Sequence, residues 1–288
     1  MTVQVSVAVS RRAECGEGPI WNPRTNAVHW VDIVGKQMLV TDVATGATDV
    51  VDYAEMVGAA APRADGGMVA AVASGFVGFD ADGRVDRRVD ILPEGIRMND
   101  AKTDPAGRYW AGSCELGFAP GRGGLWRLDE DWQPRLVLTD LTLPNGLGWS
   151  PDGSVFYLVE TQGRRILRFG FDPQSSTIIS AASVLVDSAD LPEGLPDGLA
   201  VDARGHLWLA SYGGSAVHEF SPEGMLVRTV PVPTRQTTSC NFVGPGLDEL
   251  WVTSAAAQLD PAVDPDAGSV FRVEGLGVVG LATPAFRG

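Results

Sequence analysis

Short apolar segments, separated by glycine, proline, asparagine and aspartate, recur along the whole chain. The first, VQVSVAV at residues 3–9, alternates between apolar and polar positions with a period of two, which predicts a β-strand. Further along, a turn is followed six times by a compact group of β-branched and aromatic residues. The six segments are NPRTNAVHWV from Asn22, RADGGMVAAV from Arg63, DPAGRYWAGS from Asp104, SPDGSVFYLV from Ser150, DARGHLWLAS from Asp202 and GLDELWVTSA from Gly246. The pattern therefore predicts six repeated units built from strands and turns.

The repeats start about forty to fifty residues apart, which is the length of one four-stranded blade of a β-propeller. Helical repeats of similar length would need apolar residues at helical spacing, which these segments lack. We therefore expect an all-β fold, a six-bladed β-propeller with four-stranded blades, formed by residues 1–288 as a single domain. Few residues follow Trp251, so the N-terminal strand is expected to complete the last blade and to close the ring.

Composition and charge narrow the possible partners and location. The chain has 288 residues, 44% of them hydrophobic, and a formal net charge of −14, which argues against binding to nucleic acid or to anionic membranes. The N-terminus lacks the basic and long apolar stretches of a signal peptide, and no segment has the apolar length of a membrane span. The three cysteines, Cys15, Cys114 and Cys240, are an odd number and show no metal-type spacing, so a disulfide framework is not expected. We expect a cytoplasmic protein that is a monomer or a small homo-oligomer.

One position of the repeat is polar in five of the six units. Five residues before each turn stand Glu17, Gly58, Asn99, Asn145, Asp197 and Asn241, and three of the chain's five asparagines fall on this position. Equivalent positions on the innermost strands of a propeller surround its central channel. These side chains are therefore expected to converge at the mouth of the channel.

Two carboxylates at one point would repel each other unless a cation or a proton lies between them. Their oxygen ligands suit Ca²⁺, Mg²⁺ or Mn²⁺. The alternative is that the Asn-Gly and Asp-Gly pairs only form tight turns, which both pairs do readily. Glu17, a poor turn residue, occupies the same repeat position and favours the metal site.

The motifs GEGPIW, RMNDAKTDPAGRYWAG, LPNGLGWSPDG, LPDGLAVDARGHLWLA and TSCNFVGPGLDELWVTSA resemble the regucalcin/gluconolactonase family of six-bladed propellers. The resemblance runs from Cys15 to about Ala255. It implies one divalent metal ion, of which Ca, Mg, Mn, Zn and Fe all remain open, and hydrolysis of a sugar lactone. It assigns the metal ligands to Glu17, Asn145 and Asp197.

The same resemblance assigns Arg97 and Asn99 to substrate binding. Arg97 has a structural alternative, an ion pair with Asp100. Glu115 stands one or two residues before the position where the family usually carries an acidic residue, so a sugar contact and no role at all are both open. Asn241 is expected to be either a ligand through water or a substrate contact.

The expected reaction is metal-dependent hydrolysis of an aldonolactone to the aldonic acid, with a small sugar lactone as the binding partner. Asp197 or the metal alone would activate the attacking water. Two other functions use the same ligands: a non-catalytic calcium-binding or scaffold propeller, and a metal-dependent hydrolase of other esters or phosphotriesters. The pair Arg97 and Asn99 favours a hydroxylated sugar.

Overall fold

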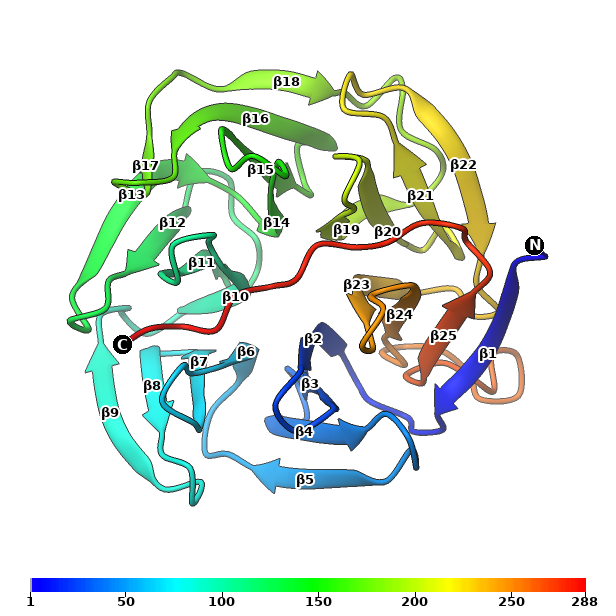
Figure 1. Ribbon diagram of the computed structural model, residues 1–288, viewed down its shortest axis with the longest axis horizontal. Coiled ribbons are helices and arrows are strands. Elements are labelled where there is room, and N and C mark those ends of the chain that lie inside the picture. The colour runs from blue at the N-terminus through cyan, green and yellow to red at the C-terminus, as the bar shows by residue number, and fades with distance from the viewer. Residues whose placement is uncertain (1) are drawn as a thin grey trace.

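The computed structural model describes residues 2–288. Within these residues the chain forms strands and turns, with no helix and hence none long and apolar enough to cross a membrane. Six antiparallel sheets stand around a central axis (Figure 1), each with the strand order of a propeller blade. The predicted all-β, six-bladed propeller with four-stranded blades is confirmed.

Each blade runs outward from an inner strand. Blade 1 consists of β2 (Gly16–Asn22), β3 (Ala27–Asp32), β4 (Gln37–Asp42) and β5 (Thr48–Asp52). Blade 2 consists of β6 (Val57–Pro62), β7 (Met68–Val72), β8 (Gly75–Phe79) and β9 (Val85–Asp90). Blade 3 consists of β10 (Ile96–Thr103), β11 (Tyr109–Glu115), β12 (Gly123–Leu128) and β13 (Pro134–Leu141).

The second half of the ring repeats this arrangement. Blade 4 consists of β14 (Pro144–Trp149), β15 (Val155–Glu160), β16 (Arg165–Asp172) and an outer edge divided into β17 (Thr177–Ile178) and β18 (Ser183–Val186). Blade 5 consists of β19 (Leu195–Val201), β20 (Leu207–Tyr212), β21 (Ala216–Phe220) and β22 (Leu226–Pro231). Blade 6 consists of β23 (Thr237–Val243), β24 (Glu249–Ser254), β25 (Val270–Glu274) and β1 (Gln4–Val9).

The N-terminal strand β1 forms the outer edge of blade 6. It pairs antiparallel with β25, with Gln4 opposite Glu274 and Val5 opposite Val273. The first and last strands of the chain therefore share one blade, and this pairing fastens the ring at its junction.

The core lies between the blades. Six buried apolar clusters each join two neighbouring blades, one at every interface of the ring. Trp30, Trp110, Trp208 and Trp251 are among the largest fully buried side chains. A single blade could not bury both of its faces, so the repeat is stable only as a ring.

The inner strands share an irregularity near their first residues. A β-bulge interrupts the pairing of each of them with its neighbour: β2, β6, β10, β14, β19 and β23. A bulge locally breaks the alternation of side chains and redirects one of them. Polar residues at these bulges can therefore face the channel although their neighbours pack in the core.

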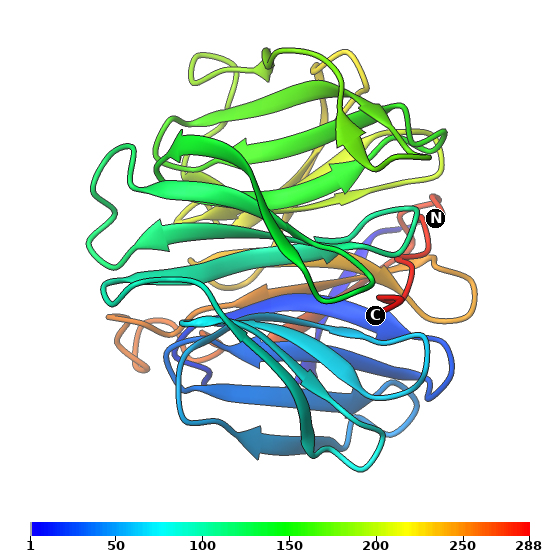
Figure 2. The same cartoon turned by 90° about the vertical axis from the view of Figure 1, so that its left-hand side faces the viewer.

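The C-terminal segment, residues 275–288, crosses one face of the ring (Figure 1). It runs from β25 past the central channel to the far side of the ring, and Figure 2 shows it on one side of the propeller. Backbone hydrogen bonds tie it to the ends of the inner strands, including Leu281 N–H to Val201 O and Phe286 N–H to Pro62 O. This face, at the ends of the inner strands, is opposite the face where those strands begin.

Candidate metal centre and active site

Four polar residues of the repeat lie at or next to the bulges of four inner strands. Glu17 of β2, Asn99 of β10, Asn145 of β14 and Asp197 of β19 are between 4% and 6% exposed. Burying two carboxyl groups and two amides in this way is costly unless they find partners. Their partners therefore define what the site can do.

The sequences PNG and PDG lie within strands β14 and β19 and are not tight turns. Glycine is needed there because the inner strands approach each other closely. A Cβ at Gly146 would lie 2.6 Å from the carbonyl oxygen of Asp197, and one at Gly198 would lie 2.1 Å from Oγ of Ser239. The glycines allow neighbouring bulges to meet around the channel.

A chain of hydrogen bonds fixes the orientation of Asn145. Arg97 Nη1 donates to Asn99 Oδ1 at 2.7 Å, and Asn99 Nδ2 donates to Asn145 Oδ1 at 2.7 Å. Asn145 Nδ2 in turn donates to Thr161 Oγ1 at 2.9 Å. Because an amide oxygen has two lone pairs, Asn145 Oδ1 keeps one for a further partner.

The sequence left open whether Arg97 forms an ion pair with Asp100. In the structure Arg97 Nη1 instead donates to Asn99 Oδ1 and to the carbonyl oxygen of Met98. Arg97 is half-buried.

The two carboxyl groups have few protein partners. Glu17 Oε2 accepts a hydrogen bond from the Gly18 N–H at 2.9 Å, and Asp197 Oδ1 is buried with no partner among residues 2–288. Burial raises the pKa of Glu17 well above its usual range, and the charges of Asp197 and Asp100 raise it further. Burial likewise raises the pKa of Asp197, with Asp100 adding to the shift. The site therefore holds three buried carboxyl groups that favour either protons or a cation.

The residues fit a divalent cation. The buried, unpartnered Asp197 Oδ1, the Glu17 carboxyl group and the free lone pair of Asn145 Oδ1 form an oxygen-only donor set of the kind that hard cations prefer. Cys15 lies close by, but burial and the charge of Glu17 raise the pKa of its thiol, so it stays protonated. Glu17, Asn145 and Asp197 are the residues that could hold the metal.

The structure does not bring Asn241 into this group. Asn241 pairs opposite Trp251, as Ala200 pairs opposite Trp208, and Ala200 is three residues beyond Asp197. The position equivalent to Asp197 in blade 6 is therefore Thr238, whose Oγ1 contacts the carbonyl oxygen of Gly16. The equivalence expected for Asn241 from the sequence is wrong.

Glu115, the last residue of β11, is used by its own loop. Its Oε2 accepts hydrogen bonds from the N–H groups of Gly117 at 2.7 Å and Ala119 at 3.2 Å. This carboxylate orders the loop after β11, and the contacts support a structural role for it.

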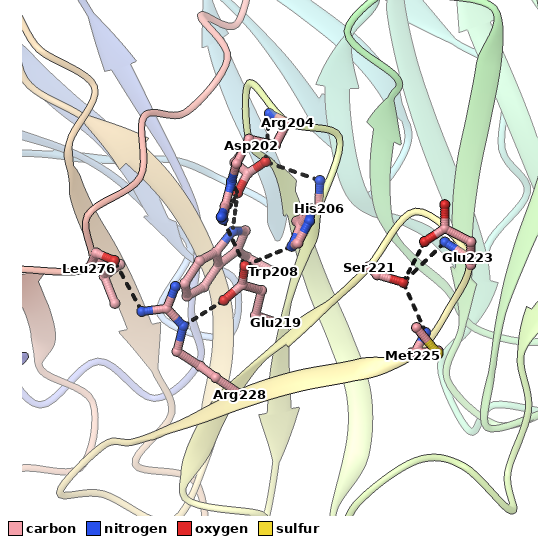
Figure 3. Close-up of polar contacts among 10 residues, drawn as sticks. All are labelled: Asp202, Arg204, His206, Trp208, Glu219, Ser221, Glu223, Met225, Arg228 and Leu276. Carbon is pink, nitrogen blue, oxygen red and sulfur yellow. Dashed lines mark hydrogen bonds and ion pairs between the residues drawn. The ribbon is translucent and has the colours of Figure 1, made fainter.

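A second acidic cluster lies near the other face, in blade 5 (Figure 3). Ligand atoms of Asp202, His206 and Glu219 lie within 4.8 Å of one another. However, Glu219 accepts from Arg204 Nη2 at 2.7 Å and from Arg228 Nε at 2.5 Å. Two guanidinium groups already balance these carboxylates, so the cluster does not require a cation.

Two residues of the site were not singled out from the sequence as members of it. Thr161 follows β15 and links the bulges of blades 4 and 5, because its hydroxyl donates to the carbonyl oxygen of Pro196 at 2.8 Å. Asp100 stands next to Asn99 and contributes the third buried carboxyl group. The RMND motif contained the signal for Asp100, whereas Thr161 lies in an ordinary turn sequence.

Comparisons with known proteins agree with this architecture. The model of the SMP-30/Gluconolactonase/LRE-like region matches residues 15–256. Pentonolactonase XacC from Haloferax volcanii is 35% identical over 290 residues, covering 98% of this chain and 97% of that protein. Human regucalcin is 32% identical over 299 residues, covering 100% of this chain and 99% of that protein.

Solved structures give the same result. A calcium-binding protein, regucalcin, from Agrobacterium tumefaciens superimposes with a TM-score of 0.92 at 30% identity, covering 98% of this chain and 96% of that chain. The chain therefore belongs to the SMP-30/gluconolactonase/LRE-like family.

Proposed function

We propose that this protein is a metal-dependent lactonase that hydrolyses a sugar lactone to the aldonic acid. The observation that carries the proposal is the buried pair of carboxyl groups of Glu17 and Asp197 beside the fixed amide of Asn145. Within residues 2–288, Asp197 Oδ1 has no hydrogen-bond partner. The name of the pentonolactonase relative supports the reaction class.

One divalent cation, held by Glu17, Asn145 and Asp197, would polarise the lactone carbonyl and stabilise the negative charge that develops on its oxygen. Among the chain's own residues, Asp197 is the candidate base, because one oxygen of its carboxyl group can hold the cation while the other accepts a proton. It would accept a proton from the water that attacks the carbonyl carbon. The bond between the carbonyl carbon and the ring oxygen then breaks, and Asp197 would return the proton to this oxygen, which becomes a hydroxyl group of the product acid.

Arg97 and Asn99 are the candidate substrate contacts. Apart from Nη1, the Arg97 nitrogens have no acceptor within residues 2–288, so they remain available to sugar hydroxyls. Its guanidinium charge also lowers the pKa of Asp197 against the opposing effect of burial. Arg97 would therefore bind the substrate and help to keep the base ionised.

A non-catalytic calcium-binding role is the second candidate. It is favoured by one observation, the similarity to a solved structure described as a calcium-binding protein. Binding a cation needs the same three ligands, so the ligands alone do not separate the two functions. Measurable hydrolysis of a lactone would separate them.

The test is release of acid from a panel of pentono- and hexonolactones. The protein is assayed after chelation and again with Ca²⁺, Mg²⁺, Mn²⁺, Zn²⁺ or Fe²⁺ restored one at a time. The proposal predicts activity that chelation removes and at least one metal restores. Saturable cation binding without hydrolysis of any lactone would favour the calcium-binding role.

A further inference from the structure

A cavity lies at the end of the channel opposite the candidate metal centre. It has a volume of about 200 Å³ and lies between the inner strands and the C-terminal segment. Lys102 and Thr103 of β10, Trp149 of β14 and Asn241 of β23 line it from the blades. Leu281 to Pro284 line it from the C-terminal segment and are partly exposed, so the cavity opens towards solvent there.

This cavity is distinct from the candidate metal centre. None of Glu17, Asn99, Asn145 and Asp197 lines it. Lys102 lies three residues beyond Asn99, on the far side of the bulge in β10. Lys102 pairs opposite Trp110, as Asn241 pairs opposite Trp251, so the two residues lie at the same level of the channel.

The charge of the cavity is unusual for this chain. The protein has a formal net charge of −14 and only two lysines, Lys36 and Lys102. No aspartate or glutamate lines the cavity, whereas two other surface hollows include Glu193 with Asp260, and Glu55 with Glu94. The carboxyl groups of Asp100 and Glu17 act on Lys102 from outside the cavity. No carboxylate lines the cavity itself, so the ammonium creates a local attraction for anions there.

Two polar groups of the lining, the Lys102 ammonium and the Trp149 indole N–H, can only donate hydrogen bonds. Trp149 Nε1, which can only donate, and Thr103 Oγ1 are buried without a hydrogen-bond partner among residues 2–288. Asn241 Nδ2 has only a long contact, 3.5 Å, to Thr283 Oγ1. Buried polar groups without partners are rare and indicate a missing ligand or water.

We propose that this cavity binds a small carboxylate anion through the Lys102 ammonium, the Trp149 indole N–H and the Thr103 hydroxyl. Lys102 Nζ donates one hydrogen bond to the carbonyl oxygen of Leu199, which leaves two protons for the ligand. Leu281, Pro284 and the Trp149 ring form an apolar wall for the carbon chain. A single ammonium and a small volume favour a monoanion over phosphate.

The state of Lys102 is consistent with this occupant. Burial lowers the pKa of Lys102, and the neighbouring carboxyl group of Asp100 opposes the shift. A carboxylate in the cavity would stabilise the charged ammonium further.

The test is calorimetric titration of chelator-treated protein with acetate, lactate, gluconate and inorganic phosphate. Chelation prevents anions from binding to a metal at the other mouth of the channel, so the result does not depend on the lactonase proposal. In parallel, the indole N–H resonance of Trp149, assigned by its loss in Trp149→Phe, is followed by NMR. We expect saturable binding of a carboxylate and a shift of this resonance.

The variants separate the site from general charge effects. Lys102→Met should weaken carboxylate binding by about tenfold or more, and the isosteric Thr103→Val by about threefold. Lys36→Met, which removes the other lysine, should bind as the wild type does. If Lys102→Met does not fold, the proposal is tested by the carboxylate affinity of Thr103→Val and by the shift of the Trp149 resonance.

Three results would overturn the proposal. They are no saturable binding of any carboxylate by the folded wild type, wild-type affinity in both Lys102→Met and Thr103→Val, or a preference for phosphate. Binding that leaves the Trp149 resonance unchanged would place the anion elsewhere and would likewise contradict it.

Discussion

Asn99 Nδ2 donates a 2.7 Å hydrogen bond to Asn145 Oδ1, and this bond crosses from blade 3 to blade 4. It joins a residue of the candidate substrate pair to a candidate metal ligand. Since Asn99 also accepts from Arg97, the substrate side and the metal side of the site are one connected network. A substitution on the substrate side should therefore change cation affinity, and a substitution on the metal side should change substrate binding.

Removing Asn99 should weaken cation binding even though Asn99 is not expected to be a ligand. In Asn99→Ala, Asn145 loses the donor that orients its oxygen, which should lower cation affinity by about 0.5–1.5 kcal/mol. Calorimetric cation titration measures this loss. Unchanged affinity together with a raised KM for the lactone would make Asn99 a substrate contact alone.

Replacing the Glu17 carboxylate should impair the metal site directly. Glu17→Gln keeps the shape and an oxygen but removes a charge, so cation affinity should fall by about 1–3 kcal/mol. Glu14→Gln is the matched control, because Glu14 is exposed and three residues away. Equal cation affinity in the two variants would show that Glu17 is not a ligand.

The stability of the metal-free protein should fall as pH rises through the acidic range. Burial raises the pKa values of Glu17, Asp100 and Asp197 in the folded state, and repulsion from neighbouring carboxylates raises those of Glu17 and Asp197 further. The native state then holds protons that the unfolded chain has released, so the free energy of unfolding decreases with pH from about pH 4 upward.

A bound cation should remove this penalty. Denaturant unfolding with and without cation is compared across pH, and the stabilisation by cation should increase from about pH 4 to pH 7. Burial lowers the pKa values of His29 and His218, so these residues make the free energy of unfolding rise with pH. Their contribution is the same with and without cation, so the difference between the two series reports on the site alone. A stabilisation that is independent of pH would contradict the ionisation scheme.

The C-terminal segment should contribute to global stability through Phe286. This ring is fully buried and packs against Trp132 at 5.4 Å and Tyr109 at 6.3 Å between ring centroids. Phe286→Ala should lower the free energy of unfolding by about 3–5 kcal/mol. Arg287→Ala, at an exposed neighbouring position, should change it little, and a similar loss in both variants would argue against the packing explanation.

The repeat in the sequence was sufficient to predict the propeller, because each unit carries its own turn and apolar group. The pairing register of the strands within each repeat was harder to predict from the sequence. Asn241 was misplaced because Gly246 lies inside the turn between β23 and β24, whereas Asp202 begins the turn between β19 and β20. The resulting error is three residues, and the sequence pattern does not reveal where the paired strands end and the turn begins.

Contacts between segments that are distant in the sequence could not be predicted either. Thr161 joins the site through the carbonyl oxygen of Pro196, a neighbour in space contributed by the next blade. The C-terminal segment forms one wall of the cavity at Lys102 because it crosses the ring, a path that no local pattern indicates. The loop contacts of Glu115 likewise depend on a backbone conformation seen only in the structure.

The most direct test of the central claim is lactone hydrolysis by Asp197→Asn at saturating metal, with metal occupancy measured on the same sample. Asparagine keeps an oxygen ligand but cannot accept the proton, so metal should still bind while kcat falls by about 10²-fold or more. Asp190→Asn, at an exposed position, is the control and should match the wild type. A near-normal kcat in fully loaded Asp197→Asn would contradict the account and leave Asp197 as a ligand only.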